Sequence, residues 1–423
     1  MRNLGSTCFM SVILQSFIHN PPLRAYFLSD KHNPNRCPNE RSTCLACQMD
    51  NLFSHLYSGE TKPFAPHEFL WSMWMSCSQL VGYAQQDAHE FFIGALNGIH
   101  NSLEMAEGAG NSRYQSHECP CIIHRIFSGV FQSTVTCLQC GNETHANDPF
   151  LDMSLDVRPV LSPHLYQPKG RASTPIMRTS VSPDTSPQPS RPPTATGMIK
   201  STGKSRSGPP SPISTSNAAP ARHDLYECLD RFTHQEHLGP LEYKCSRCQN
   251  VPQPGSPHGA MLGASKQLSL KKLPLVLCLQ LKRFDHRAFL NASAFTSMLS
   301  GATAANTSKN NDEDSSSKID QFIHFPLDLD LSPYTTRGVH LRNQKKNGAN
   351  VNISPDAEIK RSSYLYSLFA VIVHHGTINS GHYTCYVRQS GGTNQWFRFN
   401  DQMVVAVDWE EVSRCQAYVM KLL

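Results

Sequence analysis

The sequence predicts an α+β fold in which helices come first and a mostly antiparallel sheet follows. Apolar residues in the first quarter of the chain recur at helical spacing. In the second half, short alternating runs bounded by turn residues are typical of strands instead. We find no internal repeat, and 423 residues can bury a sizeable core, so we expect one large domain or two to three smaller ones.

The first helix is expected to begin at Cys8. Pro21-Pro22 ends it, and Gly5 with Ser6-Thr7 supplies the turn and the cap before it. Its buried stripe consists of Phe9, Val12, Ile13 and Phe17. Cys8 would therefore lie on the first turn, where unpaired N–H groups and the positive end of the helix dipole favour a thiolate. A cysteine nucleophile needs this arrangement, although a buried structural thiol fits the same pattern.

The later elements follow the same two periodicities. Residues 1–58 are expected to be helical apart from one loop, Phe64–Leu80 forms a second helical stretch, and a third runs from Gln85 to about Met105. The predicted strands are Ile126–Val130, Gln132–Cys137, Phe150–Val157, Lys272–Phe284, Tyr366–Val373, Tyr383–Arg388, Gln395–Phe399 and Ala417–Leu422.

Three stretches are expected to be insertions. Residues 159–221 are rich in Pro, Ser, Thr and Gly with almost no aromatic residues, so they cannot bury enough apolar surface to order themselves. We expect this stretch to be disordered. Residues 291–318 and 335–361 are expected to be flexible insertions.

The composition limits the class of protein. Fifteen cysteines without an amino-terminal signal segment indicate an intracellular protein whose thiols bind metal or carry out catalysis. The longest apolar runs, near Leu275–Leu281 and Leu368–Val373, are too short to span a membrane. The formal charge of +5 is spread along the chain, so it gives no sign of direct sequence-specific binding to nucleic acid.

A hairpin near the end of the chain places an imidazole beside a carboxamide. Folding it about residue 391 sets His382 opposite Asn400 and Tyr386 opposite Trp396. A bulge in the loop would exchange Asn400 for Asp401. A histidine whose Nδ1–H is held by either side chain, with Nε2 free to accept a thiol proton, is the general-base half of a cysteine–histidine site. An ordinary hydrogen-bonded histidine in a sheet is the simpler alternative.

Cysteine and histidine spacings predict structural Zn²⁺ sites. Two Cys-x-x-Cys turns flanked by strand-like sequence supply the first set of ligands: Cys137, Cys140, Cys245 and Cys248. The second set is His32, Cys37, Cys44 and Cys47. The third set is Cys119, Cys121 and His124, with either His100 or His117 as the fourth ligand.

Two groups of residues closely resemble motifs of the ubiquitin-specific proteases. The first group is Asn3-Leu4-Gly5-Ser6-Thr7-Cys8-Phe9 with Gln85-Gln86-Asp87. The second group is Ser380-Gly381-His382-Tyr383 with Phe399-Asn400-Asp401. Between them lie Lys272-Leu273-Pro274, Leu281-Lys282-Arg283-Phe284 and the paired Cys-x-x-Cys turns. The resemblance covers nearly the whole chain outside the three insertions.

This resemblance implies a papain-like cysteine peptidase with a helical thumb (1–125), zinc-ribbon fingers (126–158 and 222–270) and an antiparallel palm (271–423). By the same resemblance Cys8 is the nucleophile, His382 is its base, Asn400 orients the base, Asp401 assists and Asn3 helps to form the oxyanion hole. The expected reaction is hydrolysis of the isopeptide bond after the C-terminal glycine of ubiquitin. Ser6 departs from the family, which usually has Asn there, and we expect little effect.

The second and third sets of metal ligands narrow the resemblance, together with Tyr226-Glu227-Cys228-Leu229 and Glu236-His237-Leu238. They are most similar to the branch of the family that removes ubiquitin from histone H2B in the SAGA transcriptional coactivator. That branch implies a nuclear protein bound to ubiquitinated histone and to small adaptor subunits. It normally carries an amino-terminal zinc-finger domain, which we expect to be absent here because the Cys8 motif follows Met1 directly.

Two other functions fit parts of the sequence. A catalytically silent ubiquitin-binding scaffold of a chromatin complex would keep the fold, but it has no need for Cys8, His382 and Asn400 together. A zinc-ribbon nucleic-acid binder would account for the Cys-x-x-Cys pairs and the positive charge. No such pair, however, is surrounded by a dense basic and aromatic surface.

Overall fold

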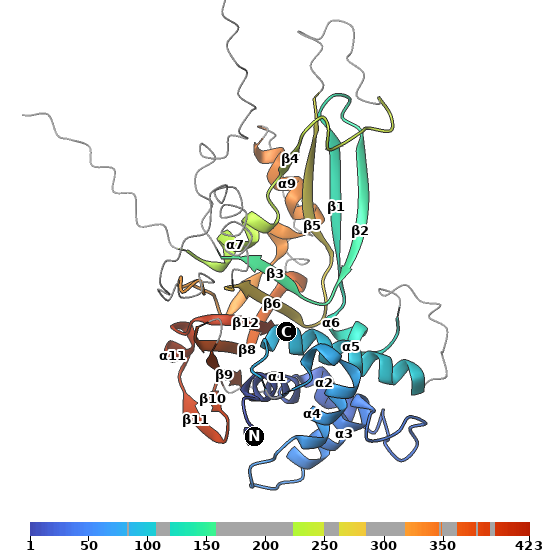
Figure 1. The fold of residues 1–423 in the computed structure, drawn as a ribbon. Helices are drawn as coiled ribbons and strands as arrows, with labels where there is room; N and C mark the ends of the chain where they lie inside the picture. Colours follow the sequence, from blue (N-terminus) through green and yellow to red (C-terminus); the bar gives the residue numbers. More distant parts are fainter. Residues whose placement is uncertain are drawn as a thin grey trace, which may run out of the picture. The chain divides into compact units, whose positions relative to one another are not determined.

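The expected α+β architecture is confirmed (Figure 1). The structure, a computed structural model, describes residues 1–82, 84–106, 119–157, 223–248, 262–284, 318–346, 348, 362–377, 380–389 and 394–423. Contacts join these residues into one compact unit. Within these ranges no helix has the length and apolarity that a membrane span requires.

The amino-terminal part is a cluster of helices around α1 (Cys8–Ile18), and every residue of α1 is buried. Asn20 ends this helix region and caps the next one, because its side chain accepts a hydrogen bond from the backbone N–H of Leu23. Pro21 then occupies the first position of α2, where proline is best tolerated. The surrounding helices are α2 (Pro21–Leu28), α3 (Leu45–Leu56), α4 (His67–Ser76), η1 (Ser78–Leu80), α5 (Ala88–Ala106) and α6 (Ile122–Phe127).

An eight-stranded sheet forms the second layer, in the order β11-β10-β9-β8-β12-β6-β3, with β7 paired to β8. All neighbours are antiparallel except β3 and β6, which run parallel. Its strands are β3 (Met153–Asp156), β6 (Leu277–Lys282), β7 (Asp328–Asp330), β8 (Leu365–Gly376), β9 (Gly381–Arg388), β10 (Trp396–Asn400), β11 (Met403–Val407) and β12 (Ala417–Leu422).

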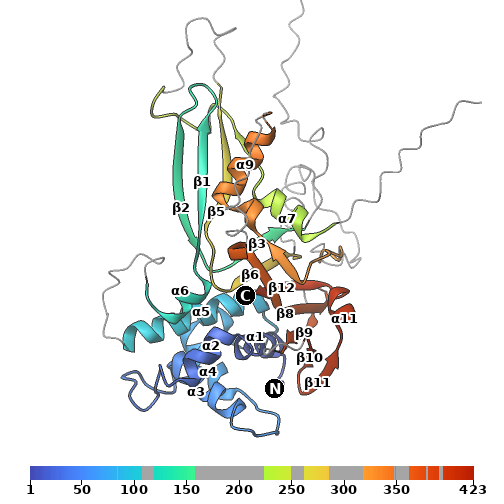
Figure 2. The ribbon, with the colours of Figure 1, turned by 180° about the vertical axis from the view of Figure 1, so that it is seen from behind.

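A second sheet has four antiparallel strands in the order β2-β1-β5-β4. Figure 2 shows its three long strands, β1, β2 and β5, extending away from the amino-terminal helices, with α9 beside them. The strands are β1 (Gly129–Cys137), β2 (Glu143–Phe150), β4 (Glu236–Leu238) and β5 (Ala264–Lys272). The remaining helices of the described residues are α7 (Leu225–Phe232), η4 (Ser332–Tyr334), α9 (Thr336–Lys346), η5 (Ser362–Tyr364) and α11 (Trp409–Ser413).

The eight-stranded sheet separates two apolar cores. Alternate residues of β8 illustrate this: Ala370 and Ile372 join the core of the helical layer, whereas Val371 and Val373 join the core on the other side. Helix α1 packs against β9 on the helical side. This packing is what brings the start of α1 to the start of β9, where the candidate site lies.

Several predicted elements need correction. Residues 126 and 127 belong to α6 rather than to a strand, because the Cys121 side chain caps that helix. Strands β2 and β11 lack the buried–exposed alternation that would have predicted them. The expected flexible insertion at 335–361 is wrong over α9, which is helical and packs Val339 inward. The insertions at 159–221 and 291–317, and most of 347–361, lie outside the described residues.

Lys421 on β12 is fully buried beneath α1. Its Nζ lies 2.7 Å from Ser16 Oγ and sits over the rings of Phe17 and Phe92, at 4.5 and 3.9 Å from the centroids. Burial lowers the pKa of Lys421 to about 8, against an ordinary value of 10.5. The lysine therefore joins the sheet to α1 at a cost in desolvation.

We predict that Lys421→Met raises the free energy of unfolding by about 1 kcal/mol at pH 7, because it removes a buried cation at nearly constant volume. Since the pKa in the folded state lies below its unfolded value, unfolding above pH 8 takes up a proton. The free energy of unfolding of the wild-type chain therefore rises from pH 8 to 10.5. The difference in this free energy between the wild-type chain and Lys421→Met becomes smaller over the same range. Thermal unfolding between pH 7 and 10 checks this. A lower midpoint for Lys421→Met at pH 7 would contradict it.

Candidate active site and metal centres

The loop before α1 is fixed by Asn3. Its Oδ1 accepts hydrogen bonds from the backbone N–H groups of Gly5 and Thr7, at 3.1 and 3.0 Å, and from Thr7 Oγ1 at 3.1 Å. Gly5 has φ +97°, which explains the glycine, and Ser6 has φ +52°. Asn adopts a positive φ more readily than Ser does, which gives a physical reason for the Asn that the family usually has at this position.

Cys8 is the first residue of α1 and is buried, with 2% of its surface exposed. Burial raises the pKa of the Cys8 thiol above its ordinary value. The backbone N–H of Tyr383 hydrogen-bonds the sulfur and opposes this shift, while the nearby charge of Asp401 adds to it. Desolvation is therefore the largest effect on the Cys8 pKa, and its direction is opposite to the thiolate that the start of the helix was expected to favour.

His382 lies at the start of β9 and directly precedes Tyr383, whose backbone N–H contacts the Cys8 sulfur. Its Nε2 is 2.7 Å from Asn400 Oδ1. An amide oxygen can only accept, so Nε2 carries the proton and Nδ1 is the basic nitrogen. This reverses the predicted use of the two nitrogens: Nε2 faces the orienting amide, and Nδ1 is left to act on a thiol.

The predicted hairpin register is wrong by two residues. Tyr386 pairs with Arg398 rather than with Trp396, so the same register sets Asn400 level with Thr384. His382 and Asn400 are therefore diagonal neighbours rather than directly opposed, and their long side chains still meet. The contact was predicted correctly, although the pairing behind it was not.

Asp401 serves a different partner. Its Oδ2 accepts a hydrogen bond from Asn3 Nδ2 at 3.1 Å, so it holds the carboxamide of the nucleophile loop instead of the imidazole. Asp401 itself has φ +49° at the tip of the β10–β11 turn. The structure thus separates two residues whose roles the sequence left open: Asn400 contacts His382, and Asp401 contacts Asn3.

Gln85 and Asp87 were part of the motif but were not predicted as site residues. Gln85 clamps the backbone of Gly381, because its Nε2 donates to the carbonyl at 2.7 Å and its Oε1 accepts from the N–H at 2.8 Å. Asp87 caps the start of α5 through the N–H of His89 and accepts a hydrogen bond from the Tyr418 hydroxyl at 2.5 Å. Gln85 therefore fixes the histidine strand β9, and Asp87 joins α5 to β12.

The three predicted sets of metal ligands are each brought together. In every set the four ligand atoms lie within 4.8 Å of one another. The sets are His32, Cys37, Cys44 and Cys47; His100, Cys119, Cys121 and His124; and Cys137, Cys140, Cys245 and Cys248. His100 is thus the fourth member of the set with Cys119, Cys121 and His124, and His117 lies outside the described residues.

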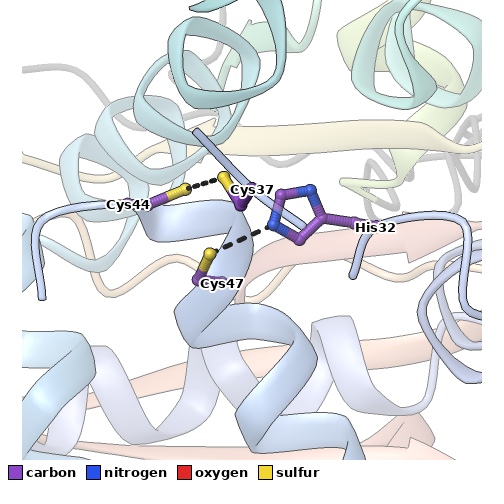
Figure 3. Close-up of side chains that lie close together, drawn as sticks. All are labelled: His32, Cys37, Cys44 and Cys47. Carbon is purple, nitrogen blue, oxygen red and sulfur yellow. Dashed lines mark hydrogen bonds between the residues drawn. The ribbon is translucent and has the colours of Figure 1, made fainter. Parts of the chain in front are cut away.

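The sulfur spacings suit a tetrahedral ion. Zn–S bonds of about 2.3 Å set two sulfurs about 3.8 Å apart, whereas a disulfide needs about 2.05 Å. The distances are 3.8 Å for Cys37 to Cys44 and 3.7 Å for both Cys137 to Cys248 and Cys140 to Cys245. Figure 3 shows the set of His32, Cys37, Cys44 and Cys47 converging at the start of α3, with His32 Nε2 3.2 Å from the Cys47 sulfur.

The set around His100 has a supporting carboxylate. His100 Nδ1 lies 3.3 Å from the Cys121 sulfur, and its Nε2 lies 3.4 Å from Glu104 Oε1. A ligating histidine that passes its other nitrogen to a carboxylate is typical of zinc sites. All three clusters have the donor types of zinc, and the described residues of each fit a closed, structural site.

Comparison with known proteins decides the family. Residues 1–421 match the family described as ubiquitin carboxyl-terminal hydrolase. The chain belongs to this family. Ubiquitin carboxyl-terminal hydrolase 22 of Mus musculus is 33% identical over 420 residues, which cover 99% of this chain and 64% of the relative. Ubiquitin C-terminal hydrolase 22 of Arabidopsis thaliana is 32% identical over 436 residues, 99% of this chain and 62% of the relative.

The fold of this hydrolase family is also found among solved structures. The SAGA DUB module of Ubp8, Sgf11, Sus1 and Sgf73 bound to monoubiquitin matches with a TM-score of 0.63 and 29% identity, covering 100% of this chain and 68% of that chain. The same module bound to ubiquitin aldehyde gives the same values. The chain spans about 64% of the length of the curated hydrolase it matches in mouse.

Proposed function

We propose that this chain is a cysteine-dependent deubiquitinase, which hydrolyses the isopeptide bond after the C-terminal glycine of ubiquitin. The observation that carries the proposal is the contact between the Cys8 sulfur and the backbone N–H of Tyr383, the residue directly after His382, whose imidazole is held by Asn400. Membership of the ubiquitin carboxyl-terminal hydrolase family supports ubiquitin as the ligand. The solved relatives with monoubiquitin and ubiquitin aldehyde support it further.

In the proposed reaction, His382 Nδ1 takes the thiol proton and the Cys8 sulfur attacks the carbonyl carbon of the terminal glycine. Asn3 Nδ2 carries two hydrogens: one is bound to Asp401, and the other would stabilise the oxyanion with backbone N–H groups at the start of α1. The C–N bond then breaks, and His382 returns the proton to the leaving lysine amine. Water, activated by the same imidazole, hydrolyses the acyl-enzyme.

Because the pKa of Cys8 is raised, the proposed reaction needs His382 to accept the thiol proton. A thiol that keeps its proton at rest must transfer it in the reaction, so the nearby base is required for every attack. The 2.7 Å contact with Asn400 holds the imidazole with Nε2 protonated and Nδ1 basic. The three residues therefore act as one unit in the proposal.

A cavity of about 440 Å³ beside this unit fits the approach of the ubiquitin tail. Its lining includes Gln85, Asp87, Glu90 and Tyr383, on the side of the site where Gln85 clamps Gly381. A Cβ atom at Gly381 would overlap the His374 ring, so only glycine fits there.

We assign the substrate, partners and location from the relatives. The match to the SAGA module supports monoubiquitinated histone H2B as substrate, adaptor subunits related to Sgf11, Sus1 and Sgf73 as partners, and the nucleus as location. The proposed Zn²⁺ occupies all three ligand sets and is structural. The subdomain boundaries remain part of this proposal: thumb 1–125, fingers 126–158 and 222–270, and palm 271–423.

A ubiquitin probe with a reactive carboxyl terminus tests the proposal. We expect covalent labelling of the chain, alone or with its adaptor subunits, and none for Cys8→Ala, read as the mass of the adduct. The Cys77→Ala variant is the control, since Cys77 is a free thiol outside the site. If the wild-type chain binds ubiquitin without labelling under both conditions, the catalytically silent scaffold is the correct reading.

A further inference from the structure

A second cavity touches the nucleophile loop at Leu4. It has a volume of about 800 Å³, and the part of α4 that lines it bears two indoles, Trp71 and Trp74, whose ring centroids are 6.4 Å apart. Leu4, between Asn3 and Gly5, is the residue that the cavity shares with the loop. The full lining is Leu4, Arg41, Ser42, Gln48, Asn51, His67, Glu68, Leu70, Trp71 and Trp74.

The two cavities share no lining residue. The smaller one is lined by Gln85, which clamps the histidine strand, and by Tyr383, whose N–H touches the Cys8 sulfur. The larger one touches the loop at Leu4, whose N–H is bound by Thr7 Oγ1 just before Cys8. Because the proposed function gives the first cavity to the ubiquitin tail, the second cavity is left for the amine side of the scissile bond.

The walls of the larger cavity suit a peptide segment. Trp71 is 53% exposed, which is unusual for so large an apolar ring, and the indoles with Leu4 and Leu70 form an apolar floor. The rim is polar: Arg41 donates to Asn51 Oδ1 at 2.9 Å, and Gln48 donates to the Arg41 carbonyl at 2.9 Å. An apolar floor with a hydrogen-bonding rim is the usual anatomy of a peptide-binding site.

We infer that this cavity binds the protein from which ubiquitin is removed, by seating an apolar side chain close to the conjugated lysine between Trp71 and Trp74. The inference rests on the proposed function, because it needs a leaving lysine at Cys8. It goes beyond that function by assigning the leaving-group side to α4. The cavity would then contribute to the choice of substrate protein and would make no contact with ubiquitin.

The test measures binding, so that it does not depend on turnover. In the Cys8→Ala background, titration with free ubiquitin and with ubiquitin linked to a lysine of histone H2B is expected to give about tenfold tighter binding of the conjugate. Adding Trp71→Ala should remove that difference and leave the affinity for free ubiquitin unchanged. Met75→Ala is the matched control, since Met75 is 60% exposed on the same helix and does not line the cavity.

Equal affinities for the two ligands in the parent chain, or a preference for the conjugate that survives Trp71→Ala, would overturn the inference. Weaker binding of free ubiquitin by Trp71→Ala would overturn it too, because the cavity would then serve ubiquitin. Hydrolysis of the conjugate by the wild-type chain is measured separately and tests the proposed function alone.

Discussion

Replacing His382 by alanine is expected to lower kcat/KM for a ubiquitin–lysine isopeptide by about 1,000-fold or more. The reason lies in the buried Cys8, whose pKa is raised, so that no resting thiolate is available when the base is lost. Steady-state hydrolysis measures the loss, and binding of ubiquitin should be unchanged. A loss below tenfold would mean that Cys8 ionises without His382.

The neighbours of His382 sharpen this prediction. Asn400→Ala should cost more rate than Asp401→Ala, and it should also change the pH profile, because Asn400 contacts the imidazole directly. Asp401 acts through Asn3, so its loss should weaken binding of ubiquitin aldehyde, whose adduct carries an oxyanion, and leave the profile in place. Asp401→Gly controls for the strain of alanine at φ +49°. The opposite order of losses would contradict the assignment.

The second large effect is expected at the zinc ligands of the four-stranded sheet. Cys245→Ser should remove one equivalent of bound zinc and lower the unfolding midpoint by roughly 10–20 °C, since a structural zinc site contributes several kcal/mol. Metal analysis should give three equivalents for the wild-type chain and two for the variant. The Cys77→Ser variant is the control, because Cys77 belongs to none of the three clusters.

Hydrogen exchange adds a local readout to the same variant. The cluster ties the β1–β2 turn to residues 245–248, so amides of β1 and β5 should exchange faster in Cys245→Ser, while those of α1 should not. Three zinc equivalents retained by the variant, or unchanged exchange in β1, would count against a structural metal at this cluster.

The sequence was informative wherever the chemistry is local. The Cys-x-x-Cys turns, the proline after α1 and the helix start at Cys8 all follow from neighbours within a few positions, and the structure places them as predicted. The cluster of His32, Cys37, Cys44 and Cys47 is the clearest case, because tetrahedral coordination allows few arrangements of closely spaced ligands.

What the sequence could not supply are contacts between distant residues. Gln85 reaches Gly381 across 296 positions, and Asn3 reaches Asp401 across 398. No periodicity encodes such pairs, so the clamp was missed and the roles of Asn400 and Asp401 stayed open. The predicted hairpin register was wrong because the register depends on the loop conformation. The direction of the Cys8 pKa shift could not be predicted because it depends on burial in the finished fold.

The attachment of Lys421 to Ser16, 405 positions apart, has a consequence for synthesis of the protein. Helix α1 is translated early and packs partly against the early helices α2 and α5, yet the strands β8, β9 and β12 that cover the rest of its surface leave the ribosome last. The nascent chain must therefore carry one exposed apolar face of α1 through most of translation, which invites chaperone binding. It also means that a truncated product without the last strands lacks the pair of His382 and Asn400, because both residues lie on strands near the end of the chain.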